Sequence, residues 1–458
     1  MSDAASKFDP WLADDGPAAL VIREHLMPVE GKDGVLFPAT YAAAEDRSKF
    51  AGGYNIDVFP EDKDVGPVVA AMLKDGRLKP TIDLFPNSPN VCLVDSVGSQ
   101  ANRIEPIFAK PEYAGLVPQV VVKAGEKLIN LLEAGHRAGD AVVRCSALQE
   151  ELRKAFQAIL KGNAEPLARI APTSLVFGVW DSRDTQAKLP RLVASTIRAF
   201  NVKKLSRSAQ FVPALEYVES GMLTDPATLT DAKEKTKLEK AYAERGFIHV
   251  PATGSHGGVI ATGGVRRDAT LSLAALRLLA VREADGTLST DRTKALRRYI
   301  LGLALVALTA PQSAYLRQGC NLVPDTDKPR EFTLVRADGQ REGKDLSHAD
   351  ALAFAQAAAK AFMIGENRPV DFDPKLAERD VKGEAPKAVT LKGKITAIEP
   401  TEKKFTVRKG RSNVVVTTTQ STTYFKDDTE STFAAVVAES AEVEVEVADG
   451  VAAKVTAS

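Results

Sequence analysis

The chain holds few of the residues on which disulfides and metal centres depend. Of its 458 residues, three are cysteine and five are histidine. Cys92, Cys145 and Cys320 lie far apart and are odd in number, which argues against a disulfide framework and favours a reducing cytoplasm. The sequence has neither a Cys/His metal-ligand spacing nor an HExxH motif. We therefore expect a cytoplasmic protein with no metal ion and no cofactor.

Long apolar segments and an excess of one charge are also missing. The longest apolar run, residues 299–310, is shorter than the roughly 20 residues that cross a bilayer, and residues 1–11 lack the apolar core of a signal peptide. We expect no membrane partner. Sixty basic residues balance sixty acidic ones. This balance argues against a protein that coats nucleic acid indiscriminately, but it allows a local basic groove.

The overall composition is typical of a folded protein, and the sequence contains both helical and strand-like segments. Hydrophobic residues make up 44% and charged residues 26%. Helical and strand-like segments do not alternate regularly, which predicts an α+β fold. Residues 37–90 are rich in Pro, Gly and Asp and are interpreted as an insertion. Predicted helices are 96–108, 147–160, 191–200, 235–245, 271–281, 293–308 and 351–362, and predicted strands are 19–26, 173–180, 209–215, 258–262 and 332–335.

The composition changes near residue 385. Beyond it the segments are rich in Val and Thr, and residues 442–447 alternate Glu and Val with the period of a half-buried strand. We predict two domains, residues 1–384 and a small all-β barrel of residues 385–458, similar to an OB-fold. Charges of both signs lie along residues 385–458, which favours a solvated barrel over a specific nucleic-acid site.

One segment concentrates positive charge. Between Asp184 and Glu216 there are six basic residues and no acidic one. Such a run can follow a phosphate backbone by releasing counterions, and a helix with a basic exposed face explains it equally well. The six are Lys188, Arg191, Arg198, Lys203, Lys204 and Arg207.

A glycine-rich segment follows at residues 253–267. Glycines such as Gly257 and Gly258 let a ligand approach the backbone closely. Arg266 and Arg267 add charge and planar stacking surfaces. The segment matches neither a P-loop nor a dinucleotide fingerprint, and a hairpin turn beside a core strand is its alternative explanation. His256 within it is a candidate general base without an evident partner.

Two further polar groups are weaker signals. Gln100, Asn102 and Arg103 lie near the start of a predicted helix, where anions bind well, although a polar helix face accounts for them equally well. Arg183 stands between Asp181 and Asp184, an arrangement that is usually structural. The sequence offers no set of residues that we assign as catalytic.

Taken together, four blocks resemble one protein family. They are residues 95–106, 171–183, 207–211 and 254–268, and they occur in this order. As a set they resemble the backbone RAMP subunit of type I-U (also called I-G) CRISPR interference complexes. The likeness spans residues 19–367 and does not include the predicted C-terminal barrel.

The resemblance implies a modified RRM, ferredoxin-like core with large insertions that form finger-like and thumb-like projections. It also implies that several copies polymerise along the spacer of a guide RNA and present it to a complementary DNA strand. A large subunit and a guide-processing RAMP subunit would complete the assembly. The residues that we assign to guide binding are Gln100, Asn102, Arg103, Arg183, Lys203, Lys204, Arg207, His256, Gly257, Gly258, Arg266 and Arg267.

Two other functions compete with this one. The first is a RAMP endoribonuclease that cuts the precursor guide RNA, with His256 as the base. In such enzymes the glycine-rich loop lies near the C-terminus, whereas here it lies in the middle of the chain. The second is an oligomeric scaffold with no role in nucleic-acid binding.

Overall fold

The computed structural model describes residues 6–46, 52–58, 90–283, 285–382, 389–400, 403–409, 412–426, 429–448 and 451–457. Much of the predicted insertion at 37–90, and the predicted boundary at 384, lie outside these residues. The chain divides into two compact units. The first comprises Met1–Arg144 and Leu148–Asp371, and the second comprises Cys145–Ala147 and Phe372–Ser458. The expected mixture of helices and strands is confirmed.

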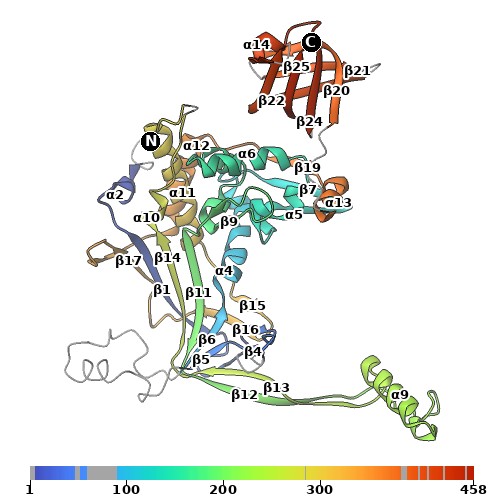
Figure 1. The fold of residues 1–458 in the computed structure, drawn as a ribbon. Helices are drawn as coiled ribbons and strands as arrows, with labels where there is room; N and C mark the ends of the chain where they lie inside the picture. Colours follow the sequence, from blue (N-terminus) through green and yellow to red (C-terminus); the bar gives the residue numbers. More distant parts are fainter. Residues whose placement is uncertain are drawn as a thin grey trace. The chain divides into compact units, whose positions relative to one another are not determined.

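A curled antiparallel sheet of nine described strands forms the centre of the first unit (Figure 1). Its order is β15-β16-β1-β14-β11-β6-β5, with β17 on β1 and β18 on β17. Every second residue of β1, from Leu20 through Pro28, is buried, so one face of the sheet packs into the core. The strands are β1 (Ala19–Pro28), β5 (Ile56–Val58), β6 (Asn90–Asp95), β11 (Val193–Phe200), β14 (Val265–Ser272), β15 (Tyr315–Arg317), β16 (Cys320–Pro324), β17 (Glu331–Val335) and β18 (Arg341–Lys344).

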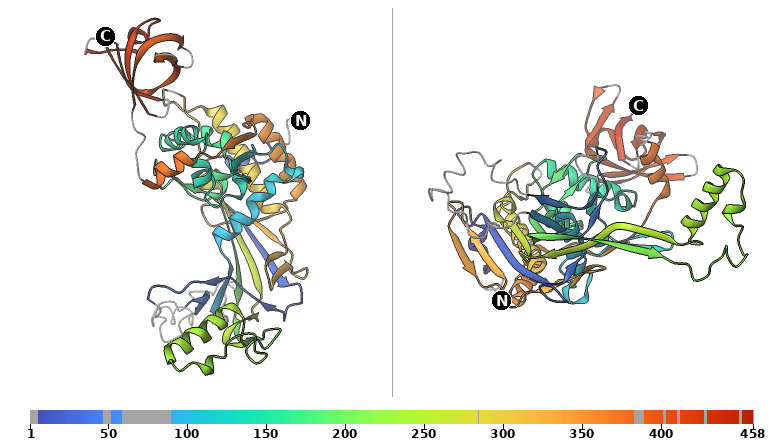
Figure 2. Two further views of the ribbon diagram at one scale, coloured as in Figure 1. Left: turned by 90° about the vertical axis from the view of Figure 1, so that its right-hand side faces the viewer. Right: turned by 90° about the horizontal axis from the view of Figure 1, so that it is seen from below.

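Two strands of this sheet continue into a long ribbon. After β11 the backbone turns at Asn201, which has a φ of 48°, and enters β12 (Val202–Phe211). The returning strand β13 (Val250–Ala261) pairs with β12 and leads through a short turn into β14. Figures 1 and 2 show the ribbon projecting from the sheet, with α9 (Ala232–Arg245) at its far end. The two-residue strand β2 (Val35–Leu36) pairs with the base of β13.

The described helices of the first unit vary widely in length. In α4 the Ser96 hydroxyl caps the helix by accepting from the Ser99 amide, and Ser347 caps α12 in the same way through the Asp350 amide. No described helix has the length and apolar composition needed to cross a bilayer. The helices are α2 (Asp9–Leu12), α4 (Val97–Ile104), α5 (Ala141–Arg144), α6 (Gln149–Leu160), α7 (Glu165–Ile170), α8 (Thr173–Phe177), α10 (Leu273–Leu276), α11 (Thr290–Thr309) and α12 (His348–Phe362).

Small sheets complete the first unit. The strand β19 runs parallel to β7, whereas the other small pairs are antiparallel. They are β3 (Thr40–Tyr41) with β4 (Gly53–Tyr54), β9 (Val179–Trp180) with β10 (Lys188–Leu189), and β7 (Val120–Ala124) between β8 (Lys127–Asn130) and β19 (Arg368–Asp371).

Four predicted elements differ from the structure. The predicted strand 209–215 ends at Phe211, with the end of β12. Residues 191–200 form the strand β11 rather than a helix. Residues 173–180 form the helix α8 and the two-residue strand β9 rather than one strand. The predicted helix 271–281 is limited to the four residues of α10, because Leu271 and Ser272 still belong to β14.

In the second unit, five strands close into a barrel. Their order around it is β20-β21-β22-β25-β24, and β24 returns to β20. The pair β22–β25 is parallel, and the short helix α14 lies between β22 and β24 in the chain. Phe405, Val407 and Val445 lie at its buried centre. The elements are α13 (Pro374–Lys382), β20 (Val389–Glu399), β21 (Lys404–Lys409), β22 (Ser412–Lys426), β23 (Thr429–Glu430), α14 (Phe433–Val436), β24 (Glu442–Ala448) and β25 (Val451–Ala457).

Candidate nucleic-acid interface

The ribbon carries three of the predicted RNA-binding residues on one strand. Lys203, Lys204 and Arg207 all lie on β12 and are exposed. None of the three forms a salt bridge with any described residue. The Arg207 guanidinium lies over the Phe37 ring, 5.7 Å from its centroid. The basic run therefore has no acidic partners in the described chain, and its charge is available to an external anion.

The glycine-rich segment lies mostly in the strand β13, which includes most of the predicted strand 258–262. Gly257 and Gly258 lie inside the strand β13, and it is protein rather than ligand that approaches them. A Cβ built on Gly257 would stand 2.9 Å from the Leu205 backbone, and one on Gly258 would stand 2.5 Å from Val35 Cγ1. Gly258 also has a φ of 95°. These glycines are therefore explained by the close packing of β13 against β12 and β2.

His256 lies in the same strand, opposite Ser206 of β12. Its ring packs against the Tyr54 ring at a centroid distance of 5.0 Å. Gly53 leaves room for it, since a Cβ there would be 2.4 Å from His256 Cε1. The Tyr54 hydroxyl in turn accepts a hydrogen bond from the Gly258 amide at 3.0 Å. These contacts give His256 a packing role at the base of the ribbon.

Arg266 and Arg267 are neighbours in β14, so their side chains point to opposite faces of the sheet. Arg266 is 9% exposed, and its Nε lies 2.9 Å from Asp268 Oδ1. Its guanidinium lies 5.4 Å from the centroid of the Phe200 ring. Arg266 thus packs on the face opposite to the buried face of β1, and the two arginines cannot act as one phosphate clamp.

Arg267 is buried on the core face of the sheet. It stands opposite Glu24 of β1, and its Nε lies 2.8 Å from Glu24 Oε2. Arg330 Nε donates to the other oxygen of Glu24 at 2.6 Å. Neither Nη atom of Arg267 has a hydrogen-bond partner among the described residues. Burial lowers the pKa of Arg267 below its ordinary value, although Glu24 opposes that shift.

Burying an unpaired donor usually costs about 1–3 kcal/mol. Arg267 is only 2% exposed and keeps two such nitrogens. The two Nη atoms of Arg267 could therefore donate hydrogen bonds that no described residue of the protein accepts.

A second buried carboxylate holds the start of α4. Asp95 Oδ1 accepts from Arg317 Nη2 at 2.7 Å, and Asp95 Oδ2 accepts from Gln100 and Arg103. Gln100 also accepts from the Ser195 hydroxyl at 2.9 Å. Gln100 is therefore buried in a structural network, whereas the Arg103 side chain remains 35% exposed.

These two networks border one cavity of about 310 Å³, which we call the arginine cavity. Glu24 and Arg267 come from the sheet, Arg103 from α4, and Arg330 from the connection between β16 and β17. Leu26, Ile197 and Leu322 give it an apolar wall. Its lining residues are Glu24, Leu26, Gln100, Asn102, Arg103, Pro106, Ile197, Arg267, Gln312, Ser313, Tyr315, Leu316, Leu322, Pro324 and Arg330.

The structure thus divides the predicted site residues into separate groups. Four of them line the arginine cavity, namely Gln100, Asn102, Arg103 and Arg267. Six lie on the two strands of the ribbon, namely Lys203, Lys204, Arg207, His256, Gly257 and Gly258. Arg183, exposed in the turn before β10, and Arg266 of β14 belong to neither group.

Sequence reasoning missed Glu24, Arg317 and Arg330. One signal was available, since Glu24 stands where the alternation of β1 places Leu20, Ile22 and Leu26 in the core. A carboxylate at such a position needs a buried partner. The identity of that partner depends on the sheet register, which the sequence alone does not give.

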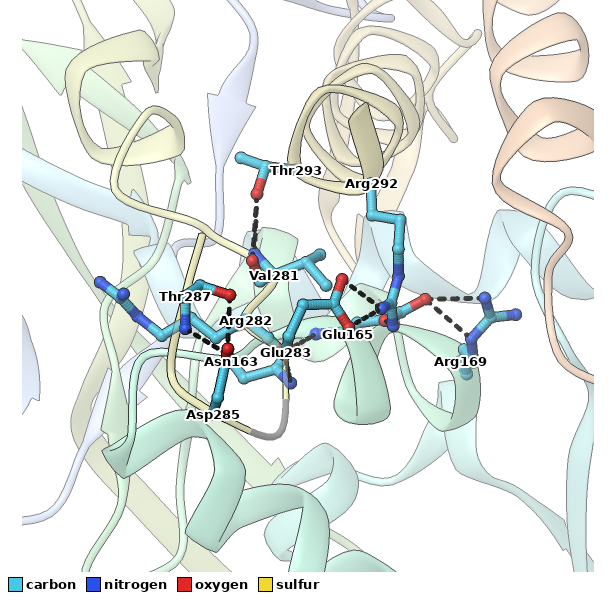
Figure 3. Close-up of polar contacts among 10 residues, drawn as sticks. All are labelled: Asn163, Glu165, Arg169, Val281, Arg282, Glu283, Asp285, Thr287, Arg292 and Thr293. Atoms are coloured by element: carbon cyan, nitrogen blue, oxygen red, sulfur yellow. Dashed lines mark hydrogen bonds and ion pairs between the residues drawn. The ribbon is translucent and has the colours of Figure 1, made fainter. Parts of the chain in front are cut away.

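A second polar cluster, away from the arginine cavity, has as many carboxylates as arginines (Figure 3). Glu165 accepts from Arg169 Nη2 at 2.7 Å and also binds Arg292, while Arg292 Nη1 reaches Glu283 at 2.9 Å. Arg169 donates to the Met363 carbonyl as well, at 2.6 Å. Two carboxylates therefore balance two arginines. This cluster joins α7 to the start of α11 and has the character of a structural network.

No group of three or more His, Cys, Asp or Glu side chains in the described part of the chain is placed to hold a metal ion.

Residues 20–204 match the protein family described as CRISPR-associated protein GSU0053. The matched segment begins in β1 and ends in β12, and it contains Asn102 and Arg103. No curated protein matches the chain. The family match supports a CRISPR-associated protein.

Proposed function

We propose that this protein binds a CRISPR guide RNA without regard to its sequence, as the repeating backbone subunit of a type I-U/I-G interference complex. The partners would be the guide, further copies of the chain, a large subunit and a guide-processing RAMP subunit, with target DNA reached through the guide. The protein itself would bind RNA rather than cut it. The family match and the four sequence blocks support this proposal.

The observation that carries the proposal is the unpaired positive charge of the ribbon. Lys203, Lys204 and Arg207 are exposed and have no carboxylate partner among the described residues. Elsewhere in the first unit, arginines such as Arg103, Arg267 and Arg292 are ion-paired. Unpaired cations on a projecting ribbon suit contact with phosphates, which position a nucleic acid without reading its bases.

The strand order supports the implied RRM-like core. The strands β1, β11, β14 and β17 occur in this order in the chain, although other strands lie between them. Helices lie between β1 and β11, and α11 lies between β14 and β17. In the sheet β17 pairs with β1, β1 with β14, and β14 with β11, all antiparallel. This order resembles that of a βαββαβ ferredoxin-like unit. On this interpretation the ribbon is an extension of its central hairpin.

The C-terminal barrel supports the expected likeness to an OB-fold. Its closed order β20-β21-β22-β25-β24 contains a parallel pair, β22–β25, and a helix between its third and fourth strands in the chain. OB-folds are five-stranded barrels of the Greek-key type. Lys392 and Lys394 on β20 are paired with Glu444 and Glu442, so this part of the barrel offers little unpaired charge to RNA.

The test is a matched pair of charge removals. Lys203→Ala with Lys204→Ala removes unpaired cations from the ribbon, and Lys392→Ala with Lys394→Ala removes paired cations from the barrel. We expect the ribbon variant to bind single-stranded RNA more weakly and to lower the slope of log affinity against log salt by about 0.7 for each lost phosphate contact. The barrel variant should bind like the natural protein.

Titrations of fluorescent RNAs of several sequences, at a series of salt concentrations, measure both quantities. Equal binding by the natural protein and the ribbon variant would contradict the proposal, as would a strong preference for one RNA sequence. Cleavage of repeat-containing RNA by the purified protein, abolished by His256→Ala, would favour the endoribonuclease instead.

A further inference from the structure

We propose that the arginine cavity binds a single nucleotide, with the phosphate on the two Nη atoms of Arg267. The choice of a nucleotide over other phosphorylated ligands rests on the proposed RNA-binding function. The nucleotide is either a free one or one unit of an RNA chain, and these two sources share the same chemistry. The argument uses the charge, the hydrogen-bonding capacity and the size of the cavity.

The charge of the cavity favours an anion. Glu24 is shared by Arg267 and Arg330, and Asp95 is shared by Arg103 and Arg317. Each buried carboxylate therefore faces two arginines, which leaves positive charge in excess around the cavity. Because both carboxylates are buried, this excess acts in a region of low dielectric constant, where an incoming anion is attracted strongly.

The hydrogen-bonding capacity favours a phosphate. Arg267 is 2% exposed and lines the cavity, and its two Nη atoms have no partner among the described residues. Its Nε is held by Glu24, which fixes the direction of the planar guanidinium. A planar pair of donors matches two oxygens of a phosphate or a carboxylate. Both Nη atoms are themselves buried, so the guanidinium must turn slightly toward the cavity for a phosphate to satisfy these donors.

The size and the lining of the arginine cavity favour a ligand larger than inorganic phosphate. The cavity of about 310 Å³ lies at the lower end of the range for small-molecule sites. Leu26, Ile197 and Leu322 form an apolar wall beside Arg267, and Tyr315 and Gln312 lie on the rim. A ribose and a base fit this combination, because a base offers a flat apolar face and a polar edge.

The polar cluster of Figure 3 provides an internal comparison. It too borders a cavity, lined by Glu151, Glu165, Arg169 and Arg292 among others. There the two arginines are balanced by Glu165 and Glu283, and Arg169 also donates to a carbonyl. An arginine-to-lysine substitution can therefore be made at Arg267 and at Arg292. The comparison distinguishes the loss of phosphate donors in the arginine cavity from the loss of an ordinary ion pair.

The experiment is calorimetric titration of the full chain with AMP, adenosine, inorganic phosphate and N-acetylaspartate. We expect AMP to bind, inorganic phosphate to compete with it, and adenosine to bind at least tenfold more weakly than AMP. Arg267→Lys keeps a charge beside Glu24 but loses the planar pair of donors, and it should weaken AMP binding at least tenfold. Arg292→Lys, the matched control, should bind AMP like the natural protein.

Thermal melting of each variant shows whether it folds. If Arg267→Lys does not fold, Arg103→Gln at the rim replaces it and should weaken AMP binding several-fold. Absence of AMP binding by the natural protein overturns the inference, and so does equal binding by a folded Arg267→Lys variant. N-acetylaspartate binding as tight as AMP binding also overturns it, in favour of an acidic peptide.

A single-stranded RNA arm separates this inference from the proposed function. Long RNA that binds while AMP does not would leave the proposed function intact and reject the nucleotide site. AMP that binds while long RNA does not would reject the proposed function and assign the cavity to a free nucleotide. Competition between AMP and RNA, lost in Arg267→Lys, would place one nucleotide of the RNA in the cavity.

Discussion

At the residue scale, buried carboxylates hold the arginines of the first unit. Glu24, Asp95, Glu105 and Glu165 are all at most 5% exposed, and each lies against at least one arginine. Removing one partner of a buried pair leaves a charge without compensation and typically costs 3–5 kcal/mol. Replacing Arg266 and Arg267 together would therefore disturb the core of the sheet as well as any RNA contact. The conservative Arg267→Lys variant is the better probe for this reason.

The pair Glu105–Arg137 predicts a pH dependence of stability. Glu105 Oε2 lies 2.7 Å from Arg137 Nε, yet burial raises the pKa of Glu105 from 4.5 to about 7. Between these two values the folded protein keeps a proton that the unfolded chain has lost. The free energy of unfolding should therefore fall as the pH rises from about 4.5 to about 7, by on the order of 3 kcal/mol from this group.

Denaturant unfolding at several pH values measures this dependence. In the double variant Glu105→Gln with Arg137→Met, the contribution should disappear, because neither group titrates in that range. Glu151→Gln, a change of an exposed carboxylate paired with Arg368, serves as the control and should keep the natural profile. An unchanged profile in the double variant would show that Glu105 is ionised in the folded protein throughout.

At the element scale, the structure explains which segments the sequence could predict. Strand β1 is rich in apolar residues, and its buried positions Leu20, Ile22 and Leu26 recur with a period of two, so a strand could be predicted there. In β11 the buried face is Val193, Ser195, Ile197 and Ala199. Two of these four are small or polar and give no hydrophobic signal, while the large residues at 193, 197 and 200 imitate a helical spacing.

The reverse error occurred at α8. Its sequence is short and apolar, and periodicity alone cannot separate a buried strand from a buried helix of that length. Pro172 at its start and Gly178 after its end are the signals for a helix. Gly178 has a φ of 80°, which a residue with a side chain rarely adopts.

Gly258 and Gly254 give a prediction about the ribbon. Both lie in β13 with positive φ, 95° and 69°. A Cβ on Gly258 would meet Val35 at 2.5 Å and the Leu36 carbonyl oxygen at 2.8 Å, whereas a Cβ on Gly254 would meet nothing within 4 Å. Gly258→Ala should therefore lower the free energy of unfolding by about 1–3 kcal/mol more than Gly254→Ala, because only it overpacks the contact with β2.

Thermal or denaturant unfolding of the two variants measures that difference, and the shared positive φ cancels most of the backbone strain. Equal destabilisation would mean that strain alone explains the glycines. A Gly258→Ala variant that is stable but binds RNA less well would support the sequence-based prediction that RNA approaches the backbone at this glycine.

At the scale of the whole molecule, the candidate site was only partly predictable. The exposed charges of the ribbon follow from one basic run, so Lys203, Lys204 and Arg207 could be found in the sequence. The arginine cavity brings Glu24 of β1 together with Arg330, more than 300 positions away, and the register of β1 with β14 decides that Arg267 faces inward. A local sequence pattern cannot predict contacts between residues so far apart in the chain.

The two compact units predict that the barrel can be removed. The five barrel strands enclose their own apolar core, in which Phe405, Val407, Val416 and Val455 are at most 1% exposed. A cut after Gly383 keeps α13 and the bridge between Ser146 and Phe372. We expect residues 1–383 to fold and to bind guide RNA like the full chain, and residues 384–458 to unfold as a cooperative unit of their own.

A second cut, after Asp371, defines the boundary more closely. It also removes Phe372, and with it the bridge to Ser146 and the hydrogen bond from the Asp373 amide to the Cys145 carbonyl at 2.8 Å. The shorter fragment should therefore melt at a lower temperature than residues 1–383, because the segment Cys145–Ala147 loses its backbone partners. Melting curves and RNA titrations on both fragments distinguish the outcomes. Loss of RNA binding by a folded fragment of residues 1–383 would assign the barrel a direct part in holding the guide. Equal melting of the two fragments would show that residues 372–383 do not stabilise the first unit.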